Sequence, residues 1–198
     1  MSELFSIQLQ NRQQQGRDGV WLDLPTTTEQ VQAALRQIGI SSDNPQGLFI
    51  SGYFAEEEKR FAIPYNMVLA SNVDELNFLA SRLETLSTGE RAELNAALQA
   101  PQSELFSIGR ITDFPENVDY YVHLPDVRGP AQLGDYYLNR SGMVDMPEEW
   151  KGGIDTAQFG RYVAQQEQGV FTEYGYLVKS GDEWQKVYEG QPVPEEYR

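Results

Sequence analysis

Residues 116–198 combine two properties that restrict what this chain can fold into. They hold 13 of the 23 aromatic residues and 15 of the 30 acidic residues, against only 7 basic ones. Aromatic rings are stabilised by burial, whereas an unpaired carboxylate costs free energy when it leaves water. We therefore expect an aromatic core with carboxylates on its outer surface, and we expect this segment to be the best packed part of the chain. Such a fold would present a rigid negative surface.

The stretch 154–178 carries the clearest pattern within this segment. Its first part predicts a short amphipathic turn of helix, and Gly169 then leads into an apolar run. We predict a single strand there, because side chains two residues apart share a face of a strand. The side chains predicted to share that face are Val170, Tyr174, Tyr176 and Val178.

Residues 1–70 predict a small α+β domain. Apolar alternation predicts three strands, over residues 4–9, 20–24 and 48–54. After the second of them, Thr26 and Glu29 form a capping-box pattern that predicts the start of a helix. One apolar face continues along this helix until Gly39, which is expected to end it.

Residues 71–115 predict a helical domain. Asn72 with Glu75 repeats the capping pattern, and leucines at helical spacing follow it up to Leu86. A second helix is predicted over residues 90–100, and one more short helix is predicted before residue 115.

Residues 116–198 predict a return to mixed structure. The expected elements are a strand over 118–124, a loop over 126–134, a short helix over 133–139, a terminal hairpin that returns over 183–188, and a loose polar tail over 191–198. The sequence therefore predicts an α+β protein of three small domains, namely 1–70, 71–115 and 116–198.

The overall charge restricts the partners. The net charge is −15 and the pI is near 4.4, which disfavours nucleic acid and anionic membranes, since both are polyanions. It favours a basic groove on another protein, although acidity can also serve solubility alone. There is no cysteine, which excludes disulfides and thiolate chemistry. With no signal-peptide pattern and no long apolar run, a cytoplasmic protein is expected.

No pattern of catalytic, metal-binding or cofactor-binding residues is present, so we predict a non-enzymatic protein without cofactor. The single histidine, His123, has no cysteine or second histidine beside it to complete a zinc site. Neither a Gly-x-Ser-x-Gly motif nor a phosphate-binding glycine loop occurs. The acidic runs 56–58 and 148–149 are better explained as solvated surface. A hydrolase that uses Asp and Glu side chains is the least favoured alternative.

Several short signatures follow one another in a characteristic order. They are Trp-Leu-Asp-Leu-Pro at 21–25, the helix at 29–38, Val-Asp-Glu-Leu-Asn at 73–77, Pro-Glu-Asn-Val-Asp at 115–119, Gly-Asp-Tyr-Tyr at 134–137, Ile-Asp at 154–155, Gly-Arg at 160–161, Gly-Val-Phe at 169–171 and Tyr-Gly-Tyr at 174–176. No single signature is decisive, but their order and spacing resemble the ArdA antirestriction proteins over nearly the whole chain.

The resemblance implies a protein of mobile genetic elements that mimics bent B-form DNA. Such proteins occupy the DNA-binding groove of type I restriction-modification enzymes and inhibit them. The resemblance also implies an elongated, curved chain of three small pieces and a homodimer formed through the C-terminal region. The negative charge and the short apolar runs, in turn, predict neither binding to nucleic acid nor insertion into a membrane.

A DNA mimic needs carboxylates on a stiff support, because duplex DNA presents one negative charge per about 1.7 Å of its axis. Successive helical turns lie about 5.4 Å apart, so acidic helices suit this task. The candidate DNA-mimic carboxylates are Asp74, Glu75, Glu84, Glu90, Glu93, Glu116, Asp119, Asp126, Asp135, Asp145, Glu148, Glu149, Asp155, Glu167 and Glu173.

Four cations interrupt this acidic set unless they turn inward or pair. They are Arg128, Arg140, Lys151 and Arg161. The resulting moderate charge density leaves an alternative open, in which the chain is an interaction module of the same fold that binds another basic DNA-binding protein or regulator.

Overall fold

The structure is a computed structural model that describes residues 3–14, 18–41 and 46–197. It contains helices together with two small antiparallel sheets, which confirms the α+β class. Contacts group the chain into two compact units. Unit 1 comprises Met1–Ser87, Glu104–Glu116 and Gln185–Arg198, and unit 2 comprises Thr88–Ser103 and Asn117–Trp184. The division into domains 1–70, 71–115 and 116–198 stays a prediction.

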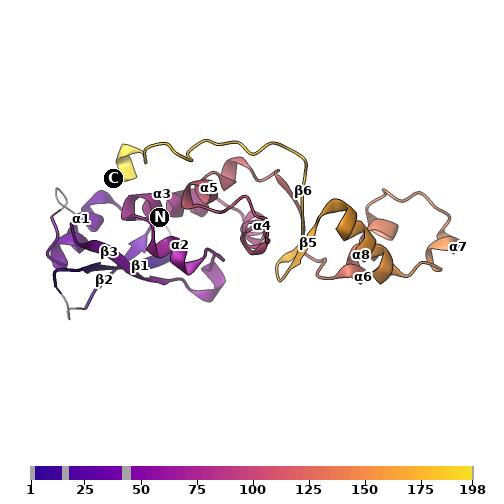
Figure 1. Cartoon of the computed structure of the whole chain (residues 1–198), viewed down its shortest axis with the longest axis horizontal. Coiled ribbons are helices and arrows are strands. Elements are labelled where there is room, and N and C mark those ends of the chain that lie inside the picture. The colour runs from indigo at the N-terminus through magenta and orange to yellow at the C-terminus, as the bar shows by residue number, and fades with distance from the viewer. Residues whose placement is uncertain (1–2, 15–17, 42–45, 198) are drawn as a thin grey trace. The chain divides into compact units, whose positions relative to one another are not determined.

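Unit 1 is built around the sheet β2-β1-β3, formed by Phe5–Asn11 (β1), Val20–Leu24 (β2) and Leu48–Phe54 (β3). These strands confirm the three that the alternating pattern predicts. One face is apolar and buried, with Ile7, Leu9 and Leu24 at 0% exposure. Helices α1 and α3 pack against β2, and α2 packs against β3 (Figure 1). The core of unit 1 therefore lies between its sheet and these helices.

The helices of unit 1 are Thr28–Gln37 (α1), Tyr65–Leu69 (α2), Val73–Glu84 (α3) and Ile108–Thr112 (α5). Among the residues described in unit 1, the short 3-10 turns Glu57–Lys59, Phe114–Glu116 and Glu195–Tyr197 accompany them. The predicted Asn72 cap of α3 is confirmed, because its side chain accepts a hydrogen bond from Glu75 N. The predicted cap of α1 is wrong by one residue, since Thr27 and Gln30 form the capping box.

Thr26 has a different role from the predicted cap, because it joins the loop before α1 to α3. Its backbone N–H donates to Asn77 Oδ1 (2.7 Å), and Asn77 Nδ2 donates to the carbonyl oxygen of Thr26 (3.0 Å). Asn77 is 1% exposed, so this reciprocal pair satisfies a buried amide that would otherwise cost free energy. It fixes the position of α3 beneath the sheet.

Unit 2 contains the sheet β4-β6-β5, formed by Tyr121–Leu124 (β4), Val170–Thr172 (β5) and Gly175–Lys179 (β6). The predicted single strand after Gly169 is wrong. The chain reverses between Thr172 and Gly175, and Phe171 pairs with Tyr176. Gly175 has φ +130°, a conformation that glycine adopts without the strain of a side chain. The four side chains predicted to share a face therefore lie on a hairpin instead.

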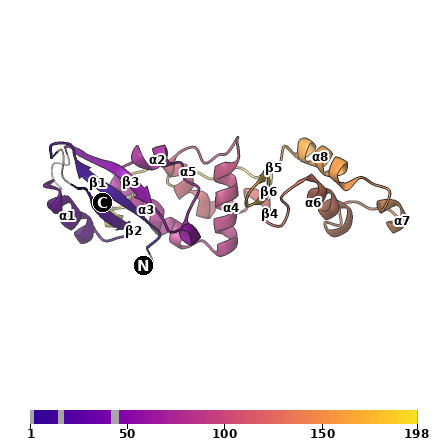
Figure 2. The ribbon, with the colours of Figure 1, turned by 90° about the horizontal axis from the view of Figure 1, so that it is seen from below.

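The helices of unit 2 are Thr88–Gln99 (α4), Pro130–Asp135 (α6), Glu148–Lys151 (α7) and Thr156–Glu167 (α8). Figures 1 and 2 both place α4 on one side of the sheet and the α6–α8 pair on the other. The predicted loop over 126–134 is wrong in its second half, where α6 begins with Pro130. Residues Tyr136–Arg140 extend α6 as a π-helix, which agrees with the predicted helix over 133–139.

Packing is distributed differently from the prediction. Most buried apolar side chains precede residue 116, so 116–198 is not the best packed segment. In unit 2 a small core forms around Val127, Leu133 and Tyr176. The predicted terminal hairpin is also wrong, since residues 180–194 form no strand. The tail is not loose either, because the turn Glu195–Tyr197 packs against α3.

Candidate functional site

The candidate carboxylates fall into both units. Unit 1 holds Asp74, Glu75, Glu84 and Glu116, and unit 2 holds the other eleven: Glu90, Glu93, Asp119, Asp126, Asp135, Asp145, Glu148, Glu149, Asp155, Glu167 and Glu173. Their surroundings differ in burial, in neighbouring cations and in hydrogen bonding. These differences decide which of them present a full negative charge to solvent.

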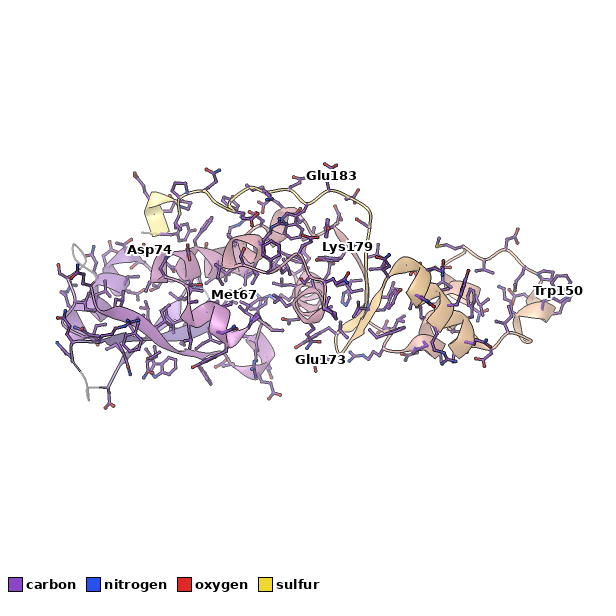
Figure 3. The ribbon with its side chains drawn as sticks, viewed as in Figure 1. Met67, Asp74, Trp150, Glu173, Lys179 and Glu183 are labelled. Atoms are coloured by element: carbon purple, nitrogen blue, oxygen red, sulfur yellow. The ribbon has the colours of Figure 1, made fainter. Side chains whose placement is uncertain are left out.

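Three of the four unit 1 carboxylates lie on α3. Asp74 and Glu75 occupy its first turn, where the positive end of the helix dipole stabilises negative charge, and Glu84 is its last residue. Figure 3 labels Asp74 on this helix. Glu116 is different, because both of its carboxylate oxygens accept hydrogen bonds from Arg82 Nη2. This ion pair compensates the charge of Glu116.

Glu93 lies in an acidic cluster of unit 2. Burial is the largest cause that raises the pKa of Glu93, and the negative charges of Glu90 and Asp119 raise it further, to about 8. Its Oε1 atom is buried and accepts no hydrogen bond from the residues that the structure describes. At pH 7 the Glu93 carboxyl is therefore mainly protonated, and it is a weak candidate for a phosphate-like charge.

Glu167 holds tyrosines together in the core of unit 2. Its carboxylate accepts hydrogen bonds from the hydroxyl groups of Tyr137 and Tyr176, the latter at 2.9 Å. Burial and these hydrogen bonds raise the pKa of both tyrosines above the usual range. Glu167 thus ties the end of α8 to the hairpin and to the π-helix, which is a structural role.

Four candidates are engaged by neighbours on the surface of unit 2. Asp135 pairs with Arg140 (3.5 Å), and Glu148 pairs with Lys151 (2.5 Å). The side chain of Asp155 caps α8 by accepting from Gln158 N (2.9 Å), as expected for a residue before a helix. Glu173 lies at the tip of the β5–β6 hairpin, where its carboxylate accepts a hydrogen bond from Gln99 (Figure 3).

Three of the four cations that interrupt the acidic set also interact with neighbouring residues. Arg140 and Lys151 pair with candidate carboxylates, and Arg128 donates to the backbone carbonyl oxygen of Glu173. Arg161 is exposed on α8. Each ion pair therefore compensates the negative charge of Asp135 or Glu148 and the positive charge of its partner, Arg140 or Lys151.

Five candidates are exposed and have neither an ion pair nor a side-chain hydrogen bond to any residue in the described part of the chain. They are Glu75, Asp119, Asp126, Asp145 and Glu149. We call these five the open carboxylates. Each belongs to a helix or to a short connection beside a strand or helix, so the backbone supports it. They carry the negative charge that a basic partner would meet.

The sequence-based set omits several exposed acidic residues near the C-terminus. Asp182, Glu183, Glu195 and Glu196 are exposed in the structure. Of these four, Glu195 and Glu196 lie in the tail that the sequence predicts to be loose. The two tyrosines near its end, which pack in unit 1, were the signal that could have revealed an ordered tail.

The described residues do not assemble a site for a metal ion. No group of three His, Asp or Glu side chains that could hold a metal ion occurs there. His123 is partly buried, and its Nε2 atom lies 2.9 Å from the carbonyl oxygen of Tyr174, so it connects β4 to the hairpin turn. The described residues include no helix long and apolar enough to cross a membrane.

Comparison with known proteins identifies the family. The family model described as antirestriction protein (ArdA) matches residues 15–178, which is most of the chain. A search of curated proteins finds no match. The matched residues include α1 to α8 and every strand except β1, which precedes them, and the last residue of β6; all fifteen candidate carboxylates lie within them. The chain belongs to the ArdA antirestriction protein family.

Proposed function

We propose that this antirestriction protein acts as a DNA mimic that occupies the DNA-binding groove of type I restriction-modification enzymes. The observation that carries the proposal is the set of open carboxylates, which stand on ordered backbone without a neutralising cation. A groove that binds duplex DNA is lined with Lys and Arg side chains, to which such carboxylates are complementary. Occupying the groove requires no chemical step, so the proposed activity is not enzymatic. Its proposed place is the cytoplasm, where such enzymes meet DNA.

The proposal is tested by neutralising three open carboxylates together, as Asp126→Asn, Asp145→Asn and Glu149→Gln. We expect the concentration that half-inhibits DNA cleavage by a type I enzyme to rise about fivefold, because each exposed charge contributes a few tenths of a kcal/mol. The measurement is an ATP-dependent cleavage assay, supported by phage plating on a host that carries the type I system.

A matched control removes the same number of charges from exposed acids outside the candidate set, as Asp18→Asn, Glu57→Gln and Glu58→Gln. This control should inhibit like the unmodified protein. An equal loss in both triple variants would show that net charge alone matters and would contradict the assigned positions. Unchanged restriction in several type I systems with the unmodified protein would contradict the function itself.

The ion pairs of Glu116, Asp135 and Glu148 favour a second candidate function. They lower the density of uncompensated charge, as expected of a module that binds some other basic protein. Such a module would bind a basic regulator and would leave type I cleavage unaffected. The same cleavage assay therefore separates the two functions.

We also propose that the chain forms a homodimer through its C-terminal region. The most exposed large apolar side chains in the described part of unit 2 are Met143 at 74%, Trp150 at 66% and Tyr162 at 59%. Figure 3 shows Trp150 pointing away from the rest of unit 2. Exposed aromatic and Met side chains are the residues most enriched at protein interfaces.

Trp150→Ala is expected to weaken the dimer about tenfold, since a tryptophan at an interface commonly contributes more than 1 kcal/mol. Sedimentation velocity over a concentration series would measure the change. Trp21→Ala is the matched control, because Trp21 is also half exposed but lies in unit 1. A dissociation constant equal for both variants, or a monomeric unmodified protein, would refute the proposed interface.

A further inference from the structure

Residues 185–197, which we call the C-terminal strap, are held in unit 1 by specific contacts. Figure 1 shows the chain after β6 running without helix or strand until the short turn at its end. The strap lies beyond residues 15–178, which the family model matches. Its contacts with α3 and α5 are of three chemical kinds.

The first kind is capture of the strap backbone by a buried carboxylate. Asp113, which follows α5, is 0% exposed. Its Oδ1 atom accepts from Tyr188 N (2.6 Å), and its Oδ2 atom accepts from Glu189 N (3.3 Å). A buried charge is tolerated where hydrogen bonds satisfy it, so the strap supplies part of what stabilises Asp113. These bonds recognise main chain at a turn, in which Gln191 N donates to the carbonyl oxygen of Tyr188 (2.9 Å).

The second kind is the packing of aromatic rings against Phe78 of α3. The ring of Tyr188 meets that of Phe78 edge to face, with centroids 5.0 Å apart, and the ring of Tyr197 lies 5.1 Å away. The guanidinium group of Arg82 stacks over the Tyr188 ring at 5.2 Å. Two tyrosines nine residues apart therefore anchor both ends of the strap on one helix.

The third kind is an ion pair that the strap completes. Arg110 of α5 lies 2.9 Å from Glu189 and 3.4 Å from Glu104. The Arg110 side chain is only 9% exposed, so this pair is shielded from solvent. Glu189, whose backbone N–H donates to Asp113, thus pairs through its side chain with an arginine that also pairs with Glu104.

The strap does not fill the space between α3 and α5. A cavity of 380 Å³ remains beside it, lined by Phe78, Ile108 and Thr112 from one side and by Tyr188, Pro192 and Val193 from the other. The strap therefore lies over a groove instead of interlocking with a close-packed core. Capture of main-chain amides, pockets for aromatic side chains and one ion pair are the features of peptide-binding sites.

We propose that α3 and α5 form a peptide-binding groove that holds the C-terminal strap as a separable ligand and accepts the same segment from a second copy of the chain. The ligand class is an acidic peptide with two tyrosines nine residues apart. This binding does not rest on the antirestriction proposal, although Glu75, one of the open carboxylates, also lines the cavity. Exchange of such a segment between copies is a low-cost route to association.

The test uses the full chain with a protease site inserted between Gln185 and Lys186, both of which are exposed. After complete cleavage, we expect the released segment to stay bound to the remainder during gel filtration at micromolar concentration. A synthetic peptide of residues 186–198, the segment that a second copy would present, should displace it. Displacement is followed through a fluorophore on the released segment.

Peptide variants keep the test separate from folding of the protein. A peptide with Tyr188→Ala and Tyr197→Ala should need about a thirtyfold higher concentration for displacement, because it lacks both aromatic contacts. A peptide with Glu195→Gln and Glu196→Gln, which alters exposed side chains, should displace like the original. The proposal is overturned if the segment separates at once on cleavage, if the protein unfolds with it, or if displacement does not depend on the tyrosines.

Discussion

Gly160→Ala is expected to destabilise unit 2 by about 3 kcal/mol, because α8 and α6 approach too closely for any side chain at this position. A Cβ atom on Gly160 would overlap the carbonyl oxygen of Pro130, and one on Gly134 would overlap that of Thr156. Both obstacles are backbone atoms of the opposite helix, so no side-chain rotation can relieve them. The two helices would have to separate and thereby open the small core around Leu133.

The matched control for this substitution is Gly89→Ala in α4. Gly89 is also a glycine within a helix of unit 2, but a Cβ atom there meets nothing within 4 Å. Alanine favours a helix over glycine by about 1 kcal/mol, so this control should be neutral or stabilising. Urea unfolding followed by circular dichroism, with hydrogen exchange to locate the change, measures both variants. Equal stability of the two variants would show that α6 and α8 are not packed as described.

Elements with local signals were predictable from the sequence. The strands of unit 1 follow period-two alternation, and α3 begins where Asn72 can cap it. These signals involve residues at most a few positions apart, so no knowledge of the fold was needed to interpret them. The same holds for the family resemblance, whose signatures are short and ordered along the chain.

Elements defined by distant contacts were not predictable. The reversal at Glu173 and Tyr174 lacks the Asn-Gly type of pair that marks a two-residue hairpin. Residues 183–188 were expected to pair with β6, but the amide of Tyr188 bonds to Asp113, which lies 75 positions earlier. Gly134 lies where the predicted loop 126–134 and the predicted helix 133–139 overlap, and the sequence does not show that its missing side chain permits helix packing.

The candidate site shows the same division. The number of carboxylates and their excess in residues 116–198 follow from composition alone. Composition does not show which of them lack a pairing cation. Arg82, for example, pairs with Glu116, which lies 34 positions later in the chain. Glu93 and Glu167 look like ordinary surface acids in the sequence, and only the folded chain shows one partly buried and the other bonded to two tyrosines.

Glu93→Gln is expected to stabilise the protein by about 2 kcal/mol at pH 8. This is roughly half of what the pKa shift would give for a fully buried group, and the discount is made because the side chain is partly exposed. The pKa of Glu93 is raised from 4.5 to about 8 in the folded chain. Below pH 4.5 the carboxyl is protonated in the folded and unfolded chain alike, and Gln should then bring little change. As the pH rises from 4.5 to 8, the unfolded chain releases a proton that the folded chain retains, so the free energy of unfolding of the unmodified protein falls.

The increase in the free energy of unfolding caused by Glu93→Gln should therefore grow between pH 4.5 and 8. Above pH 8 it should stay constant, since the Glu93 carboxyl is then ionised in both the folded and the unfolded chain. Thermal unfolding of both proteins at pH 4, 6 and 8 would measure it. Glu149→Gln is the control, because Glu149 is exposed and has no paired cation in the described residues; its effect should be small at every pH. The neighbours Glu90 and Asp119 contribute to the shift, so Asp119→Asn should reproduce part of the gain. A gain from Glu93→Gln that is the same at pH 4 and pH 8 would mean that packing, and not a retained proton, accounts for it.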